Sequence, residues 1–191
     1  GALGDMACHI IEPPFRVLGL GYPTEVECSV GSVYVDEFKR GYFPDSCPPS
    51  SHVIMTFPGA TGKPNVKFHW MDGGIQPERP EELGPNEMMG DGGYGINPQL
   101  LPTALTKEAN VAQKYKRVTD GADGHYAQWV EGCIAGYGKT ELSSPFELAG
   151  PLTEGLLMGN LAIRSYDIRK QRQGGRADQF DYPGRFIKLL W

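Results

Sequence analysis

Two side chains near the start of the sequence have the types and the spacing of an acid/base pair. Asp5 and His9 are four residues apart, so in a helix the carboxylate and the imidazole lie on one face within mutual reach. A carboxylate that accepts a hydrogen bond from one ring nitrogen fixes the tautomer of a histidine, which leaves the other nitrogen to move a proton. The spacing leaves a structural alternative open, in which Asp5 caps the helix N-terminus and His9 is a packed histidine.

The other three histidines offer weaker candidates. His52 and His69 lie on expected strands, where ordinary surface placement is the interpretation. His125 begins an expected helix, where capping and packing explain it, with contact to a substrate as the alternative. These three histidines have no spacing that indicates a metal site.

Composition limits the class of protein. The chain has 191 residues, of which 40% are hydrophobic and 21% are charged, values typical of one globular domain with a real core. A net charge of −5 does not favour a nucleic-acid or anionic-membrane partner. No apolar stretch approaches the length of a membrane span. The sequence favours neither the cytoplasm nor export.

The cysteines fit neither a zinc pattern nor a disulfide framework. Four cysteines in a chain of this size are too few and too widely spaced for either, so we expect buried free thiols. They are Cys8, Cys28, Cys47 and Cys133.

The first half of the chain predicts a helix followed by a sheet. The helix runs from about Asp5 and is broken or ended at Pro13-Pro14, although an apolar face continues to Gly19. Polar and apolar residues alternate over 25–30, as in a strand with one buried face. Residues 32–35 are a candidate extension of this strand.

Two further strands are expected at 52–57 and 65–70. The turn-rich segment 58–64 between them predicts a hairpin. Alternation in the second of these strands favours an antiparallel sheet that is covered on one side.

A turn-rich segment over 72–102 follows and is unusually long for a loop in a compact domain. Its glycine cluster at 90–93 is not a phosphate cradle, because no strand precedes it and no helix follows directly.

Helical patterns return in the second half. Apolar spacing predicts a helix over 126–134, and Pro151 is the expected first position of a last helix. Gly155 and Gly159, four residues apart, give that helix a smooth face for close packing. The final run, 186–191, is strand-like.

Five separate stretches of the sequence, taken in order, form one recognisable pattern. They are residues 1–9 (GALGDMACH), 70–74 (WMDGG), 124–130 (GHYAQWV), 149–164 (AGPLTEGLLMGNLAIR) and 181–185 (DYPGR). In this order they resemble the C-terminal domain of the Gfo/Idh/MocA oxidoreductase family, named for glucose–fructose oxidoreductase and inositol dehydrogenase.

The resemblance implies a two-domain enzyme in which an N-terminal Rossmann domain holds NAD or NADP. Residues 1–191 would be the C-terminal substrate-binding and oligomerisation domain, an α+β fold with an open, predominantly antiparallel sheet and helices packed on one face. In many members the helix that bridges the domains carries an Asp and a His four residues apart, which match Asp5 and His9. There the His acts as acid/base on the substrate hydroxyl or carbonyl.

Two parts of the family's pattern do not occur in this sequence. They are the Glu-Lys-Pro motif, whose lysine completes the family's site, and the glycine-rich dinucleotide fingerprint. We therefore expect the sequence to be part of a longer protein and to bind no dinucleotide by itself.

Three functions follow as hypotheses. The first is an NAD(P)-dependent oxidoreductase acting on a sugar, inositol or related polyol, with His9 as acid/base and Asp5 orienting it. The second keeps the fold but is an NAD-dependent glycosidase of the N-acetylgalactosaminidase kind. The third is a non-catalytic oligomerisation or binding module. A sheet covered on one side needs a partner for the other, so a homo-oligomer is also expected.

Overall fold

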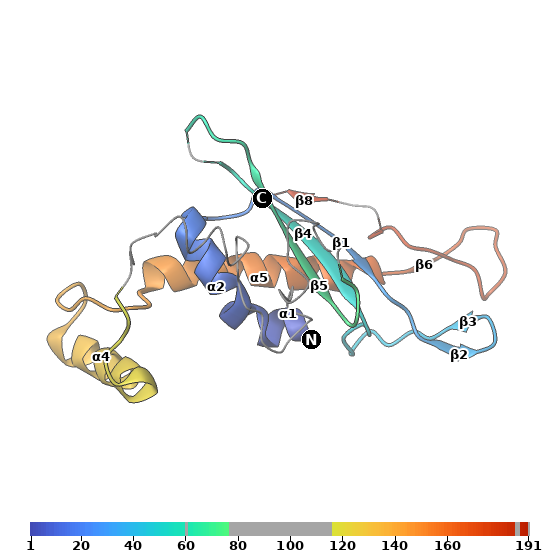
Figure 1. Cartoon of the computed structure of the whole chain (residues 1–191). Helices are drawn as coiled ribbons and strands as arrows, with labels where there is room; N and C mark the ends of the chain where they lie inside the picture. Colours follow the sequence, from blue (N-terminus) through green and yellow to red (C-terminus); the bar gives the residue numbers. More distant parts are fainter. Residues whose placement is uncertain (60, 77–115, 186–187, 191) are drawn as a thin grey trace, which may run out of the picture. The chain divides into compact units, whose positions relative to one another are not determined.

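The computed structural model describes residues 1–59, 61–76, 116–185 and 188–190 (Figure 1). The chain forms two compact units. The first contains Gly1–Pro98 and Pro151–Trp191, and the second is Gln99–Gly150. The turn-rich segment expected over 72–102, from residue 77 onward, and the glycine cluster at 90–93 lie outside the described residues.

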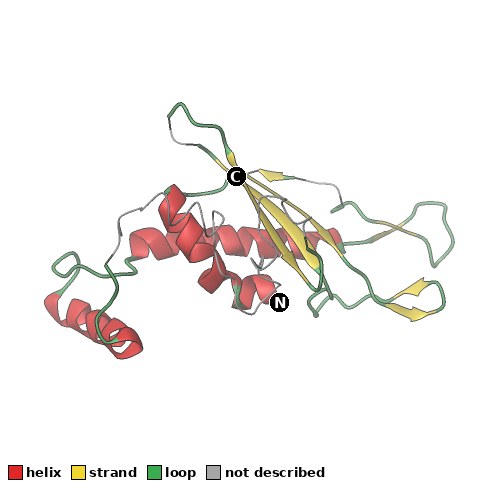
Figure 2. Cartoon of the chain, in the orientation of Figure 1, coloured by secondary structure: helices red, strands yellow, loops and turns green. Residues whose placement is uncertain are grey.

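The first unit is built on an open antiparallel sheet (Figure 2). Its strands are β1 (Glu25–Val30), β4 (Ser51–Phe57), β5 (Val66–Asp72) and the short β8 (Leu189–Leu190). They are ordered β5-β4-β1-β8, and every pairing is antiparallel. The predicted hairpin and the α+β class with an open antiparallel sheet are confirmed.

Alternation along the strands separates a buried face from an outer face, as the sequence predicts. Val53, Met55 and Phe57 of β4 are buried, and Val26 and Trp70 are buried beside them on β1 and β5. The register places Val26 opposite Met55 and Val53 opposite Trp70. The residues that alternate with these buried positions point to the outer face. They are Glu25, Glu27, Ser29, His52, Ile54, Lys67, His69 and Met71.

Helix α5 (Phe146–Tyr166) covers the buried face through two glycines, and its residues from Pro151 onward belong to the first unit. A Cβ at Gly159 would lie 2.7 Å from Leu3 Cδ2 and 3.4 Å from Val53 Cγ1. At Gly155 the nearest atom, from Pro23, would be 3.7 Å away, an ordinary contact. The close packing predicted from this glycine pair is therefore present, and it is tightest at Gly159.

The last helix begins five residues before the expected Pro151. Pro145 directly precedes it, and the carbonyl of Pro145 accepts hydrogen bonds from the backbone N–H groups of Leu148 and Ala149. Pro151 therefore lies inside the helix, where its missing N–H costs one intrahelical hydrogen bond. The expectation that Pro151 opens the helix is therefore wrong, because the residue before the helix is another proline, Pro145.

The opening helix is divided into α1 (Ala2–Asp5) and α2 (Ala7–Leu18). The break falls at Met6 and not at Pro13-Pro14, which lie inside α2. Ile11 and Phe15, on either side of the prolines, are buried, and Phe15 packs edge-on against Phe57 with ring centroids 5.9 Å apart. Burial of these side chains offsets the hydrogen bonds that the prolines remove.

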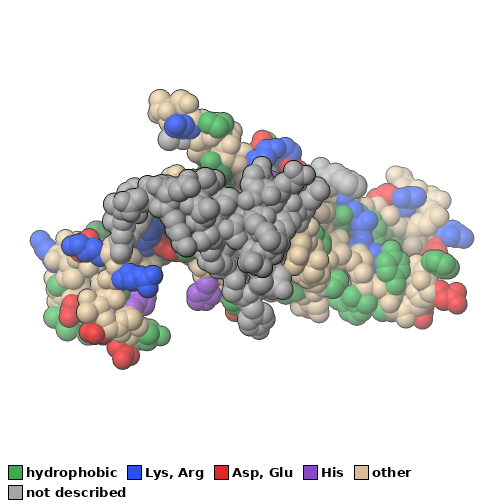
Figure 3. Space-filling model, in the orientation of Figure 1, with side chains coloured by type: hydrophobic (Ala, Val, Ile, Leu, Met, Phe, Trp, Pro, Cys, Tyr) green, Lys and Arg blue, Asp and Glu red, His purple; other side chains and the backbone are tan. Residues whose placement is uncertain are grey.

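The expected extension of β1 at 32–35 is wrong. β2 (Tyr34–Asp36) instead pairs with β3 (Lys39–Arg40) in a separate hairpin, and β6 (Lys170–Gln171) pairs with β7 (Phe180–Asp181) in another. Apolar and charged side chains lie interspersed over these hairpins (Figure 3).

A cation–π contact holds the base of the second hairpin. The guanidinium of Arg169 lies 3.7 Å from the ring centroid of Tyr42 and 4.2 Å from that of Phe180. Arg169 thus joins the loop after β3 to β7 through contacts with both rings.

In the second unit, α4 (Gly121–Ala135) confirms the helix expected over 126–134, and Gly136 ends it. None of the residues of α4 is buried, so its apolar stripe is exposed within the described structure. Leu142 returns to lie over Gly132, where a Cβ would be 3.0 Å from the leucine methyl.

The cysteines are free, as expected, but they are not buried. Cys8, Cys47 and Cys133 are exposed, and Cys28 is half-buried. Burial, and secondarily the negative charge of Asp167, raises the pKa of the Cys28 thiol to about 11. Composition could indicate the redox state of the thiols but not which face of an element they occupy.

The contrast between the two glycines of α5 gives a matched test of this packing. Gly159→Ala should lower the free energy of unfolding by about 1–3 kcal/mol, because the new methyl overlaps the fully buried Leu3. Gly155→Ala should be neutral or stabilising by up to about 1 kcal/mol, since alanine favours helix and finds space there. Urea unfolding measures both free energies. Equal effects of the two substitutions would contradict the closer packing of α5 at Gly159 than at Gly155.

Candidate functional site

Asp5 and His9 project away from the core of the first unit. The buried residues of this segment recur every four positions, at Leu3, Ala7, Ile11 and Phe15. At 100° per residue, His9 lies about 180° from the centre of that stripe and Asp5 about 140° from it. Both side chains are exposed.

The break at Met6 does not move the pair to different sides. The Met6 backbone keeps right-handed helical angles, φ −98° and ψ −24°. Its N–H donates to the Ala2 carbonyl at 2.8 Å, and its carbonyl accepts from the Ile10 N–H at 3.2 Å. The helical spacing of four residues therefore persists from Asp5 to His9.

The structural alternative for the pair is not observed. Gly1 occupies the N-cap of α1 and Met6 that of α2, and neither helix has a side-chain capping bond. Within the described part of the chain, no hydrogen bond or ion pair engages the side chain of Asp5 or His9, and the two do not bond to each other. Both groups are exposed relative to the other described residues.

The next carboxylate along the same side of the helix is already engaged. Glu12 Oε1 lies 2.6 Å from Arg16 Nη2 and also accepts a hydrogen bond from Arg16 Nε. Glu12 follows His9 by three residues and is also within helical reach of the imidazole. Among the described residues, Asp5 therefore has no ion pair, whereas Glu12 does.

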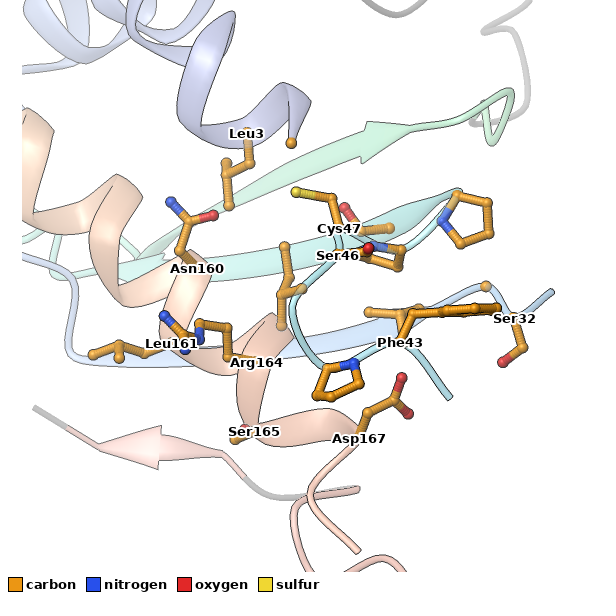
Figure 4. A pocket seen from close by; sticks show the side chains of 18 of the residues that line it. Leu3, Ser32, Phe43, Ser46, Cys47, Asn160, Leu161, Arg164, Ser165 and Asp167 are labelled. Atoms are coloured by element: carbon orange, nitrogen blue, oxygen red, sulfur yellow. The ribbon is translucent and has the colours of Figure 1, made fainter. Parts of the chain in front are cut away.

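A large open groove of about 1690 Å³ lies elsewhere in the first unit (Figure 4). The start of α1, the loop 41–49 and the last turns of α5 line it. Asn160 and Arg164 of α5 face it together with apolar side chains such as Leu161 and Phe43. Asp5 and His9 are not among the described residues that line this groove.

One end of the groove is fixed by charges. Asp167 Oδ1 lies 2.6 Å from Arg40 Nη2 and 3.6 Å from Arg185 Nη2. The Arg185 guanidinium also stacks 3.7 Å from the ring centroid of Tyr182. A single carboxylate thus joins the β2–β3 hairpin, the end of α5 and the segment after β7.

His125 belongs to the second unit, so it is a candidate separate from Asp5 and His9. It lines a small open cavity of about 450 Å³ with Gln128, Trp129 and Ser143. His125 Nδ1 is 3.4 Å from Ser143 Oγ, and Gln128 Oε1 accepts from the Ser143 backbone N–H at 3.1 Å. These contacts hold the loop against α4.

His52 and His69, each expected to be an ordinary surface histidine, lie side by side in the structure. They form a pair on the outer face of the sheet, with His52 Nε2 3.0 Å from His69 Nδ1. Their rings are stacked, with centroids 5.2 Å apart. The signal in the sequence was that both lie at outward positions of neighbouring strands, but the register that makes them neighbours comes from the structure.

Further features limit what these residues can do. Among the described side chains, no group of three or more His, Cys, Asp or Glu is placed to hold a metal ion. None of the helices described has both the length and the apolar composition needed to cross a bilayer. No family model matches the chain, and no curated protein sequence matches it.

The environment of His52 predicts an acid-dependent loss of stability. Burial, and then the positive charge of His69, lowers the pKa of His52 from its ordinary 6.5, against an opposing effect of Glu27. Below pH 6.5 the unfolded chain therefore binds more protons than the folded one, so stability falls as the pH falls.

Substitution of His52 tests this directly. In His52→Gln, the decrease in Tm between pH 7 and pH 5 should be smaller than in the unchanged protein. In His69→Gln the decrease should be intermediate, because burial still acts on His52 after the charge of its neighbour is gone. A Tm that depends on pH equally in all three proteins would contradict the assignment.

Proposed function

We propose that this chain is the substrate-side domain of an NAD(P)-dependent oxidoreductase acting on a sugar, inositol or related polyol. His9 exchanges the proton of the reacting hydroxyl or carbonyl, and Asp5 orients the imidazole. The observation that carries the proposal is that these two side chains are exposed, unengaged by other described residues and on the same outward side of the α1–α2 segment. The ordered family resemblance of the five stretches supports it.

The cofactor belongs to another domain in this proposal. Every strand pairing in the described part of the chain is antiparallel, so none of it forms the parallel βαβ unit of a dinucleotide site. The nicotinamide of NAD or NADP supplies the hydride chemistry when it is bound. The residues of this chain then handle only the substrate and its proton.

The roles of the pair are assigned from their spacing of four residues and from the family resemblance. In this structure the two side chains share a side of the helix without bonding to each other. In the proposed working site the Asp5 carboxylate accepts from one ring nitrogen of His9, and the other nitrogen takes the hydroxyl proton. Glu12 cannot replace Asp5 without giving up its ion pair with Arg16. Exposure of the pair suits a site that is completed by a surface from outside the unit. His125 remains a second, weaker candidate for contact with the substrate.

The same residues also suit an NAD-dependent glycosidase, in which transient oxidation of the sugar permits elimination of the aglycone. The two reactions differ in their net products. A dehydrogenase accumulates reduced cofactor with a free sugar, whereas the glycosidase releases the aglycone with no net change in the cofactor. The third possibility, a binding or oligomerisation module, predicts that neither signal depends on His9.

Substitutions in the full-length protein test the catalytic assignment. His9→Asn should lower turnover by about 10²–10⁴-fold, the usual contribution of a general acid or base. Asp5→Asn should also lower it and should alter the pH profile, because the imidazole loses its orienting acceptor. Assays with NAD or NADP and a panel of sugars, inositols and aryl glycosides measure both reduced cofactor and released aglycone.

Glu12→Gln is the matched control, since it removes a carboxylate from the same side of the helix. It should leave turnover within about threefold of the unchanged enzyme, a difference well under the effect expected for a general base. Turnover that persists in His9→Asn would remove His9 from the mechanism, and an effect of Glu12→Gln as large as that of Asp5→Asn would remove the special role of Asp5.

The proposal includes a homo-oligomer formed through the outer face of the sheet. That face is mixed in character and not continuously apolar. It places Ile54 and Met71 among charged residues and histidines, and Leu190 of β8 is 73% exposed. Lys188 forms ion pairs with Glu25 at 3.4 Å and Glu27 at 3.9 Å, which neutralise part of the charge on this face.

Light scattering on the full-length protein tests the assembly. The expected mass is a multiple of that of one chain, and Ile54→Glu should shift it toward the monomer, because a charge at the centre of the face would be buried in the interface. The control Val17→Glu changes a residue that is 54% exposed on α2 and should leave the mass unchanged. A monomeric mass for the unchanged protein would count against the interface.

A further inference from the structure

The second unit contains a two-sided cavity built on one face of α4. His125, Gln128, Trp129 and Gly132 follow one another at helical spacing, so they lie on the same side of the helix. The chain turns back after α4, and Leu142 covers Gly132, where a Cβ would be 3.0 Å from the leucine methyl. Residues 142–144 form the second wall of this cavity of about 450 Å³, a volume within the usual range of small-molecule pockets.

Two polar contacts hold the wall at 142–144 against the helix. Gln128 Oε1 accepts from the backbone N–H of Ser143 at 3.1 Å, and His125 Nδ1 lies 3.4 Å from Ser143 Oγ. The engaged oxygen fixes the orientation of the Gln128 amide, and its two N–H donors have no partner among the described residues. The same holds for His125 Nε2. The cavity therefore keeps oriented polar groups for a ligand.

An aromatic surface lies beside these polar groups. Trp129 lines the cavity with 66% of its surface exposed, and its neighbour Tyr126 is 67% exposed. The indole of Trp70, by contrast, is buried in the core of the first unit. An indole has a large, flat, apolar face. Trp129 is thus a platform against which a ring-shaped ligand can stack.

The lining of the cavity selects against charged ligands. The described residues that line it are His125, Tyr126, Gln128, Trp129, Leu142, Ser143 and Ser144, and none of them is Asp, Glu, Lys or Arg. A phosphate, carboxylate or ammonium group would find no charged partner among these residues. The ligand that fits is neutral, with an apolar ring face for the indole and hydroxyl or amide groups for the polar side chains.

We propose that this cavity binds an uncharged sugar ring of the pyranose type, stacked on Trp129. The C–H groups of such a ring form an apolar face, and its hydroxyls both donate and accept, as the side chains of Gln128 and Ser144 require. The polar groups of the cavity come from both walls, which suits hydroxyls arranged around a ring better than the in-plane polar atoms of a nucleobase. The site lies in the second unit and needs neither His9 nor a dinucleotide, so it does not rest on the proposed oxidoreductase function.

Saturation-transfer difference NMR on the full chain, without NAD or NADP, tests the site. The probes are methyl β-D-glucopyranoside, methyl β-D-galactopyranoside and methyl α-D-mannopyranoside, with sorbitol as a polyol that has no ring face. At least one pyranoside should receive saturation most strongly at the C–H protons of one ring face, and sorbitol should receive none. Trp129→Leu should weaken the binding by more than about tenfold, as expected for the loss of an aromatic anchor. His9→Asn should bind with unchanged affinity, which separates this site from the proposed catalytic pair.

Phe146→Leu is the matched control, because it removes an exposed aromatic ring of the second unit that does not line the cavity. It should leave the affinity unchanged. Trp129→Phe keeps a smaller ring and should bind with intermediate affinity, and it replaces Trp129→Leu if circular dichroism melting shows that the leucine variant has lost its fold. Absence of saturation in all three pyranosides, equal affinity in the folded Trp129 variant and the unchanged protein, or binding of adenine alone would overturn the proposal.

Discussion

The close approach of α5 to the sheet determines the arrangement of the first unit. At Gly159 the helix has no side chain, and Leu3 of α1 fills the space together with Val53 and Met55 of β4. One contact therefore joins the first helix, the last helix and a central strand, which are far apart in the sequence. Because Leu3 starts the inward stripe of α1 and α2, this contact also sets the rotation of the segment and directs Asp5 and His9 outward.

The parts of the fold that follow from local burial could be predicted from the sequence. Strands β1, β4 and β5 alternate between a packed face and a solvated one, and that period of two is visible in the residues themselves. The errors came where tertiary contacts outweigh local preference. Pro13 and Pro14 remain in α2 because Ile11 and Phe15 are buried beside them. This burial cannot be predicted from the prolines themselves, which locally favour the end of a helix.

The two histidine arrangements also differ in whether local sequence or tertiary structure determines them. The relation between Asp5 and His9 follows from the helical period, so their spacing was enough to predict that they share a side. The relation between His52 and His69 depends on strand register across the eight residues of 58–65, a loop long enough to allow several registers. A slip of one residue would have moved one of them to the buried face. Their contact could not be obtained without the structure.

The three imidazoles also show why surroundings, and not residue type, assign a chemical task. An acid/base histidine needs one nitrogen oriented and the other free to exchange a proton, the arrangement proposed for His9 with Asp5 four residues away. His52 and His69 direct one nitrogen of each ring toward the other, so one ring donates a hydrogen bond to its neighbour. A nitrogen engaged in this way is a poor proton carrier for a substrate. The surroundings therefore favour His9 over His52 and His69 for the proposed proton transfer.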